Sequence, residues 1–333
     1  MSTRLMLLLP LLLIALFGCS PAIDGIQSPE GLPGLTETPF QPEGELTPLP
    51  ELGLVTPGVP DAETPPSSAL SFDQLRNAEY RTLGLYDSTV QTFRLEDGLY
   101  RVGTDPAAEN YMAVSLIEPY AFGNLNNDEF ADAAVILVEN YGGTGQFVHI
   151  GAVLNRDGQT VHADSFFLGD RVAVNALGIQ NGEIVAALTV HGPEEPACCP
   201  TVPANIHLRL INDNQLVVTR FTTQTPAGQE RAINIRAPLS GSEASGSITI
   251  SGDVTIAPFE NNLIYTVYDS EYQQIAQSYL TVDAPDLGAP GAFTLTLDLA
   301  SLGRTGNIYV EISDISVADG STIALAQIQL IVR

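Results

Sequence analysis

Short apolar runs rich in β-branched residues recur along most of the chain, and turn-forming residues separate them. Asp-Gly pairs stand at 97–98 and 157–158, an Asn-Gly pair at 181–182 and Asn-Asp-Asn at 212–214. These residues tolerate positive φ and favour tight turns. Because tight turns join antiparallel neighbours, the sequence predicts an antiparallel β-meander. Its strands are expected at 92–95, 99–102, 111–118, 131–138, 146–154, 161–167, 172–179, 183–190, 206–211 and 216–221.

The meander is expected to form a first domain at 69–229, opening with a short helix around Phe72 and Leu75. A polar, Pro-containing joint at 225–228 precedes a second domain at 230–333. About seven strands in about a hundred residues are typical of a β-sandwich. The strands of the second domain are expected at 233–236, 246–251, 253–257, 263–268, 276–282, 292–297, 307–314 and 323–332.

The order of short motifs in the second domain resembles a known family. The motifs are Ile-Arg-Ala-Pro at 235–238, Ser-Ile-Thr-Ile-Ser-Gly-Asp-Val at 247–254, Pro-Phe-Glu-Asn-Asn at 258–262, Val-Tyr-Asp at 267–269, Gly-Ala-Phe-Thr at 291–294 and Ser-Val-Ala-Asp-Gly at 316–320. This order is similar to that of the immunoglobulin-like domain of bacterial spore germination. The resemblance covers the last third of the chain. It implies an immunoglobulin-like β-sandwich that serves as an extracytoplasmic adhesion or scaffold module, and it brings no catalytic residues.

The chain begins with Arg4 and an apolar run at 5–17 that ends in Gly18-Cys19. A membrane-spanning helix needs about 20 residues, so the run is typical of a signal peptide. Its end resembles the lipobox of bacterial lipoproteins. That resemblance implies a signal peptide at 1–18 and a lipid on Cys19, which would anchor the chain on the extracytoplasmic face of the cell membrane. The alternative is an ordinary secretory signal in which Cys19 is incidental.

Residues 19–68 are rich in Pro, Glu and Thr and contain no Arg. Such a segment buries too little apolar surface to fold, so it is expected to be a disordered tether. The whole chain has a net charge of −26, with 13 Lys+Arg against 39 Asp+Glu, and its cationic residues are all Arg. This charge repels phosphate backbones and excludes nucleic acid as a partner.

A loop at 123–132 is the best candidate for an ion site. Asn124, Asn126, Asp128 and Asp132 present side-chain oxygens at a spacing similar to the calcium loops of FG-GAP-type repeats and dockerin-like modules. Calcium prefers six to eight oxygen ligands, and two carboxylates with two amides make a weak version of such a site. The alternative is an Asn/Asp-rich turn closed by its own hydrogen bonds.

Cys198 and Cys199 are adjacent, within a loop that starts at His191. Neighbouring Cα atoms lie about 3.8 Å apart, below the usual range for disulfides, yet an oxidising exterior favours bond formation. The pair is therefore expected to be a vicinal disulfide or two free thiols. A zinc site formed by the thiols with His191 and His207 is a weaker alternative, because no Cys-x-x-Cys pair is present.

No recognisable catalytic motif stands in the sequence. His149 and His162 lie within expected strands and are interpreted as sheet residues. The sequence thus predicts a non-catalytic binding or scaffold module that contacts an unidentified envelope polymer or protein. The alternative is an envelope hydrolase with a metal-assisted site in the loops 124–132 and 191–200.

Overall fold

The computed structural model describes residues 69–84, 89–193, 195–196 and 198–333. Cys19, the predicted signal peptide and the predicted tether lie outside the described residues. Strands dominate the described part, and its named strand pairs are antiparallel except that of β14 with β20. The predicted all-β class is confirmed. Within these ranges no helix has the length and apolar character needed to cross a membrane.

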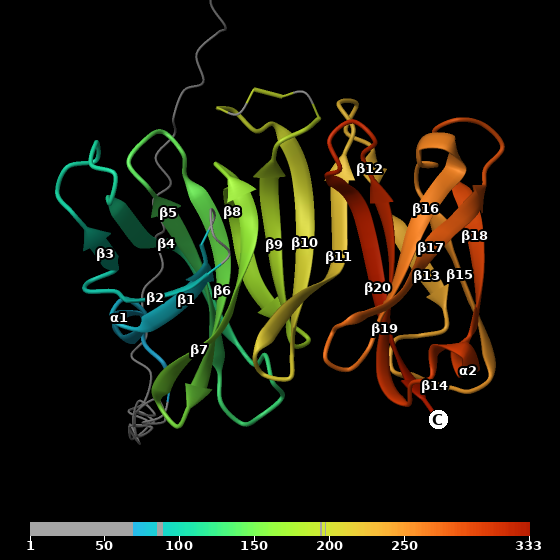
Figure 1. The fold of residues 1–333 in the computed structure, drawn as a ribbon, viewed down its shortest axis with the longest axis horizontal. Coiled ribbons are helices and arrows are strands. Elements are labelled where there is room, and N and C mark those ends of the chain that lie inside the picture. The colour runs from blue at the N-terminus through green and yellow to red at the C-terminus, as the bar shows by residue number, and fades with distance from the viewer. Residues whose placement is uncertain (1–68, 85–88, 194, 197) are drawn as a thin grey trace, which may run out of the picture. The chain divides into compact units, whose positions relative to one another are not determined.

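The first half of the described chain is a helix and a series of hairpins (Figure 1). Ser71 and Gln74 form a capping box that starts the single-turn helix, which was expected in this place. The elements are α1 (Phe72–Leu75), β1 (Glu79–Leu83), β2 (Val90–Arg94), β3 (Leu99–Val102), β4 (Met112–Gly123), β5 (Asp132–Asn140), β6 (Phe147–Arg156), β7 (Gln159–Asp170), β8 (Ala173–Gln180), β9 (Glu183–Val190), β10 (Val202–Ile211), β11 (Gln215–Gln224) and β12 (Glu230–Arg231).

These elements form three layers. Strands β3 to β7 make a five-stranded meander, and β8 to β11 make a second meander. One core lies between the two meanders, built from alternate residues such as Ile136, Ile150 and Ile184. The opposite face of the five-stranded sheet is covered by α1 and the β1–β2 hairpin, around Leu75 and Tyr80. Both faces of β5 and β6 are therefore buried, which explains their nearly unbroken apolar sequence.

The predicted turn residues have the backbone conformation that motivated the prediction. Asp97 and Asp157 have φ of 54° and 52°, and the glycines that follow them have φ of 85° and 81°. Asn181 and Asn212 also have positive φ. Two successive positive values match the twist of paired strands, and the turn at 157–158 closes the hairpin of β6 and β7. The turn at 97–98 instead joins β2 to β3, which lie in different sheets, so the meander expected at this point is wrong.

The second half of the described chain is a β-sandwich, with a short 3₁₀ turn and a helical turn between its strands. One sheet contains β13, β15 and β18, and the other contains β16, β19 and β20, while β17 pairs with both β16 and β18. The elements are β13 (Ile233–Ala237), β14 (Ser242–Ala244), β15 (Ser247–Val254), η1 (Phe259–Asn261), β16 (Asn262–Tyr268), β17 (Gln274–Asp283), β18 (Gly291–Asp298), α2 (Leu299–Leu302), β19 (Gly306–Ile315) and β20 (Thr322–Val332).

One strand prediction in the sandwich is wrong. The runs 246–251 and 253–257 were expected to be separate strands, with Gly252 between them. They are instead one strand, β15, which ends at Val254. A Cβ on Gly252 would lie 2.1 Å from the backbone oxygen of Asn234 and 2.4 Å from the ring of Phe293. The glycine therefore permits close approach within the sandwich and does not form a turn.

The second meander, β8 to β11, shares one sheet with strands of the sandwich, while β3 to β7 form a separate sheet. Strand β11 pairs with β20 through Arg220 opposite Ala326 and Phe221 opposite Leu325, and Figure 1 shows the two strands side by side. The hydroxyl of Thr223 adds a 2.8 Å hydrogen bond to the backbone oxygen of Ile323. We call this junction the seam. The division into domains at 229/230 stays a prediction, because the described residues belong to one compact unit.

Candidate functional site

The loop proposed for calcium connects β4 to β5 and brings its four candidate residues together. Asp132 is fully buried, and its two carboxylate oxygens accept hydrogen bonds from the backbone N–H of Leu125 (2.8 Å) and Asn155 (2.9 Å). Burial raises the pKa of Asp132, with a further contribution from the charge of Asp128, while these backbone hydrogen bonds oppose the rise.

The other three candidates are also engaged by neighbours. Asp128 accepts hydrogen bonds of 2.8 Å from the backbone of Phe130 and from the side-chain amide of Asn126. Asn124 accepts one of 2.5 Å from the backbone of Asn127. The loop is thus closed by its own hydrogen bonds. Over the described ranges, no group of three or more His, Cys, Asp or Glu is placed to hold a metal, and calcium binding stays a prediction.

Asp128→Ala distinguishes the turn from an ion site. We expect the substitution to lower the free energy of unfolding by about 1 kcal/mol, because the N–H of Phe130 loses its acceptor. If the loop is a plain turn, the loss is the same with and without calcium in urea unfolding experiments. A loss that grows with added calcium, together with calorimetric heat that disappears in the variant, would instead establish an ion site.

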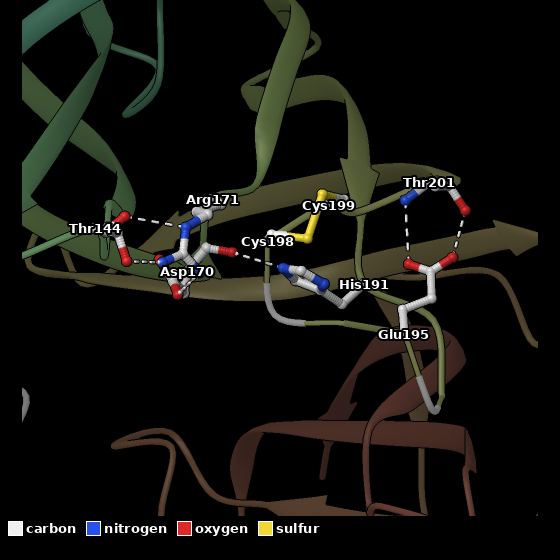
Figure 2. Close-up of a disulfide and its surroundings, with 8 residues drawn as sticks. All are labelled: Thr144, Asp170, Arg171, His191, Glu195, Cys198, Cys199 and Thr201. Atoms are coloured by element: carbon white, nitrogen blue, oxygen red, sulfur yellow. Dashed lines mark hydrogen bonds and ion pairs between the residues drawn. A yellow bond between two sulfur atoms is a disulfide. The ribbon is translucent and has the colours of Figure 1, made fainter.

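The second predicted site is the loop between β9 and β10, drawn in Figure 2. Cys198 and Cys199 are exposed and joined by a disulfide, with Cα atoms 3.8 Å apart. Glu195 closes the base of the loop (Figure 2): its carboxylate accepts hydrogen bonds from the backbone N–H of Gly192 (2.9 Å) and Thr201 (3.1 Å) and from the Thr201 hydroxyl. These hydrogen bonds, that of the Thr201 side chain first, lower the pKa of Glu195.

The histidines proposed as zinc ligands lie apart. His191 directly follows β9, and its Nε2 lies 3.1 Å from the backbone oxygen of Asp170 (Figure 2). His207 lies opposite Val185 near the start of β9, with its Nδ1 3.3 Å from a carboxylate oxygen of Glu183. The structure therefore does not bring His191 and His207 to one site with the cysteines.

An apolar groove lies beside the disulfide loop. It consists of two adjoining hollows of about 340 and 250 Å³ that share Val190, His191, Ser321 and Thr322. The first hollow is the more apolar one, and the second is more polar. The first is also lined by Phe166, Phe167, Phe221 and Leu325, and the second by Glu195, Thr223 and Arg231. The side chains of Phe166 and Phe221 face the core next to the first hollow, whereas the ring of Phe167 lies on the other face of β7 against His149. We call these two hollows together the apolar groove.

The groove is not among the sites predicted from the sequence, although one local signal for it is present. Phe166, Phe167 and Leu168 are consecutive apolar residues in one strand, where alternate side chains point to opposite faces. Phe166 and Leu168 therefore share the face next to the groove, while Phe167, which is 44% exposed, lies on the opposite face with its ring centroid 5.1 Å from that of His149. The opposite wall of the groove includes Thr322 and Leu325 of β20, which lie far from this strand in the sequence.

Two polar side chains are buried together on the hairpin-covered face of the five-stranded sheet. Glu139 and His149 are 0% and 1% exposed, and His149 Nε2 lies 3.6 Å from Glu139 Oε1. The Tyr141 hydroxyl donates a 2.8 Å hydrogen bond to the other carboxylate oxygen. Burial alone would raise the pKa of Glu139, but interactions with His149, Thr82 and Tyr141 outweigh it and lower the pKa. Such complete burial gives a substrate no access, so this pair is structural.

His162 and Ser165 form the closest approach to a nucleophile and base. His162 Nε2 lies 2.9 Å from the Ser165 hydroxyl. Burial, reinforced by the charge of Arg81, lowers the pKa of His162 to about 4. Its Nδ1 is buried without a hydrogen-bond partner in the described part of the chain, so no carboxylate orients the ring. The pair thus lacks the third group of a catalytic triad.

Comparison with models of protein families identifies a domain in the second half of the chain. Residues 232–321 match the model of the immunoglobulin-like domain of bacterial spore germination, which covers the sandwich from β13 to the turn before β20. The family resemblance found in the sequence is therefore confirmed for the last third of the chain. No curated protein matches the chain in a sequence search.

Proposed function

We propose, from the premise that residues 232–321 are a spore germination immunoglobulin-like domain, that the chain is a non-catalytic binding module of the bacterial cell envelope. Its apolar groove binds an extended envelope polymer. The observation that carries this proposal is the groove itself, which joins an aromatic hollow to a polar hollow beside a disulfide-bridged loop.

The chemistry of the groove supports an extended ligand. The phenylalanine rings provide flat apolar surfaces, and such rings contribute most of the binding energy in many recognition sites. The polar hollow adds hydrogen-bonding groups of Glu195, Thr223 and Arg231. A polymer with alternating apolar and polar faces would satisfy both hollows along its length.

The location of the module rests on the sequence. The lipobox-like end of the apolar run at 5–17 supports a lipid on Cys19, and the Pro-rich segment at 19–68 supports a tether that lifts the module away from the membrane. The net charge of −26 opposes binding to nucleic acid. Together these features support a lipid-anchored protein on the extracytoplasmic face of the cell membrane.

Phe166→Ala tests the groove. We expect this variant to bind isolated cell walls of the host bacterium at least about tenfold more weakly than the native chain, because an aromatic contact of the first hollow is lost. Co-sedimentation of the full chain with the walls measures the change. Leu287→Ala is the matched control, since Leu287 is 81% exposed and lies outside the groove.

Cys19→Ser provides the complementary variant in the same experiment. It should leave the membrane fraction while retaining wall binding, whereas Phe166→Ala should stay in the membrane fraction and lose wall binding. Wall binding by Phe166→Ala at the native level would refute the groove as the contact surface. Retention of Cys19→Ser in the membrane fraction would refute the lipid anchor.

A further inference from the structure

A second concave surface lies at the seam and shares no residue with the apolar groove. This cleft has a volume of about 390 Å³. Strands β9, β10 and β11 supply one wall, and β13 and β20 supply the other. Ligand sites form preferentially at such junctions between packed regions.

The charge of the cleft is opposite to that of the whole chain. Its lining contains Arg209, Arg220 and Arg236 but a single carboxylate, that of Glu183. The chain as a whole has three acidic residues for each of its 13 arginines. The cleft is therefore a local concentration of positive charge on a strongly acidic protein, and such a concavity attracts anions.

Two of the three guanidinium groups have carboxylate partners. Arg209 donates a 2.6 Å hydrogen bond to Glu183, and Arg236 is paired with Asp253. Arg220 differs from them, because its two terminal nitrogens lie 3.3 and 3.4 Å from the side-chain oxygen of Asn234. Among the described residues no carboxylate forms an ion pair with Arg220. About one positive charge is thus left uncompensated in the cleft.

We propose that the cleft binds a singly charged oxyanion, a carboxylate or a phosphodiester, through Arg220. The planar guanidinium has five N–H donors in a fork that matches two oxygens of such a group. Arg209 and Arg236 flank the site. Glu183 lies in the same lining and opposes a doubly charged group. This site is independent of the apolar groove, so a negative result for one of the two sites does not contradict the other.

Arginine side-chain NMR tests the site directly. The full chain, labelled with ¹⁵N-arginine, gives no more than 13 Nε–Hε signals, since it has 13 arginines and no lysine. It is titrated with sodium acetate in one arm and with sodium dimethyl phosphate in another, at constant ionic strength. We expect the signal of Arg220 to shift saturably in at least one arm, followed by those of Arg209 and Arg236. The arm that saturates at the lower concentration identifies the kind of oxyanion.

Three variants complete the test. Arg220→Gln should weaken binding about tenfold, because a charged hydrogen-bonding partner is lost. Glu183→Gln should strengthen it, because the opposing carboxylate is removed. Arg94→Gln is the matched control at an exposed position of β2 outside the cleft, and it should leave binding unchanged. Equal, non-saturating shifts of all the arginines, or unchanged binding in Arg220→Gln, would overturn the proposal.

Discussion

Replacing Tyr309 with alanine is expected to split one thermal unfolding transition into two. Tyr309 is 5% exposed and lies in a small cluster at the seam with Ile211 and Val217. Its ring contacts that of Tyr272 edge to face, with centroids 5.5 Å apart. Removing a buried aromatic ring costs about 3 kcal/mol or more. That loss falls on the contacts across the seam, because the cores on either side of it consist of other residues.

The native chain should therefore unfold in one transition, and the variant in two. Differential scanning calorimetry of the full chain measures both. Tyr279→Ala is the matched control, since Tyr279 lies on β17 of the same sandwich but is 73% exposed, and it should keep the single transition. Two transitions in the native chain would show that the seam does not couple the unfolding of its two sides. A single transition in Tyr309→Ala would show that the coupling does not depend on the cluster around Tyr309.

Glu139→Ala is expected to lower the free energy of unfolding at neutral pH by about 3 kcal/mol. The substitution leaves His149 buried without its acidic neighbour. Removing one partner of a buried pair destabilises the fold because the other polar group stays buried without compensation. The double variant Glu139→Leu/His149→Leu should recover part of the loss, because His149 is removed together with its partner, while the Tyr141 hydroxyl still loses its acceptor. Urea unfolding of the three proteins provides the comparison.

The effect of Glu139 should depend on pH. Its pKa in the folded chain lies below the usual 4.5, so ionised Glu139 stabilises the fold above about pH 4.5. As the pH falls through the lowered pKa, the carboxylate becomes protonated and this contribution disappears. The difference between the native chain and Glu139→Ala should therefore shrink in acid. A difference that stays constant from neutral pH to acid would mean that the charge of Glu139 does not contribute.

Strands and turns could largely be predicted from the sequence because their signals are local. The pairs Asp157-Gly158 and Asn181-Gly182 fix hairpins without reference to the rest of the chain. Predictions failed where a distant residue decides the outcome. The strand expected at 111–118 continues through Pro119 to Gly123, because a register shift between Ile117 and Ala121 accommodates the proline. Gly252 likewise suggests a break between two strands, because the local sequence does not show that Phe293 lies against it.

The same limit applies to the candidate sites. The four oxygen-bearing residues of the loop before β5 lie within nine positions, so their proximity could be predicted. Glu139 follows the strand expected at 131–138 and would ordinarily mark its exposed end. It is buried because His149, Tyr141 and Thr82 surround it, and Thr82 belongs to a different sheet. The apolar groove and the cleft around Arg220 each combine residues from strands on both sides of the seam, and no local pattern reveals such combinations.

The shared groove limits how this protein can be recombined in evolution. Phe166, Phe167 and Phe221 come from the meanders, while Thr322 and Leu325 come from the sandwich. A gene fragment that encodes only the sandwich would carry one wall of the groove into a new protein, and the fragment left behind would keep the other. Descendants that retain the binding surface should therefore inherit both halves together and in the same order.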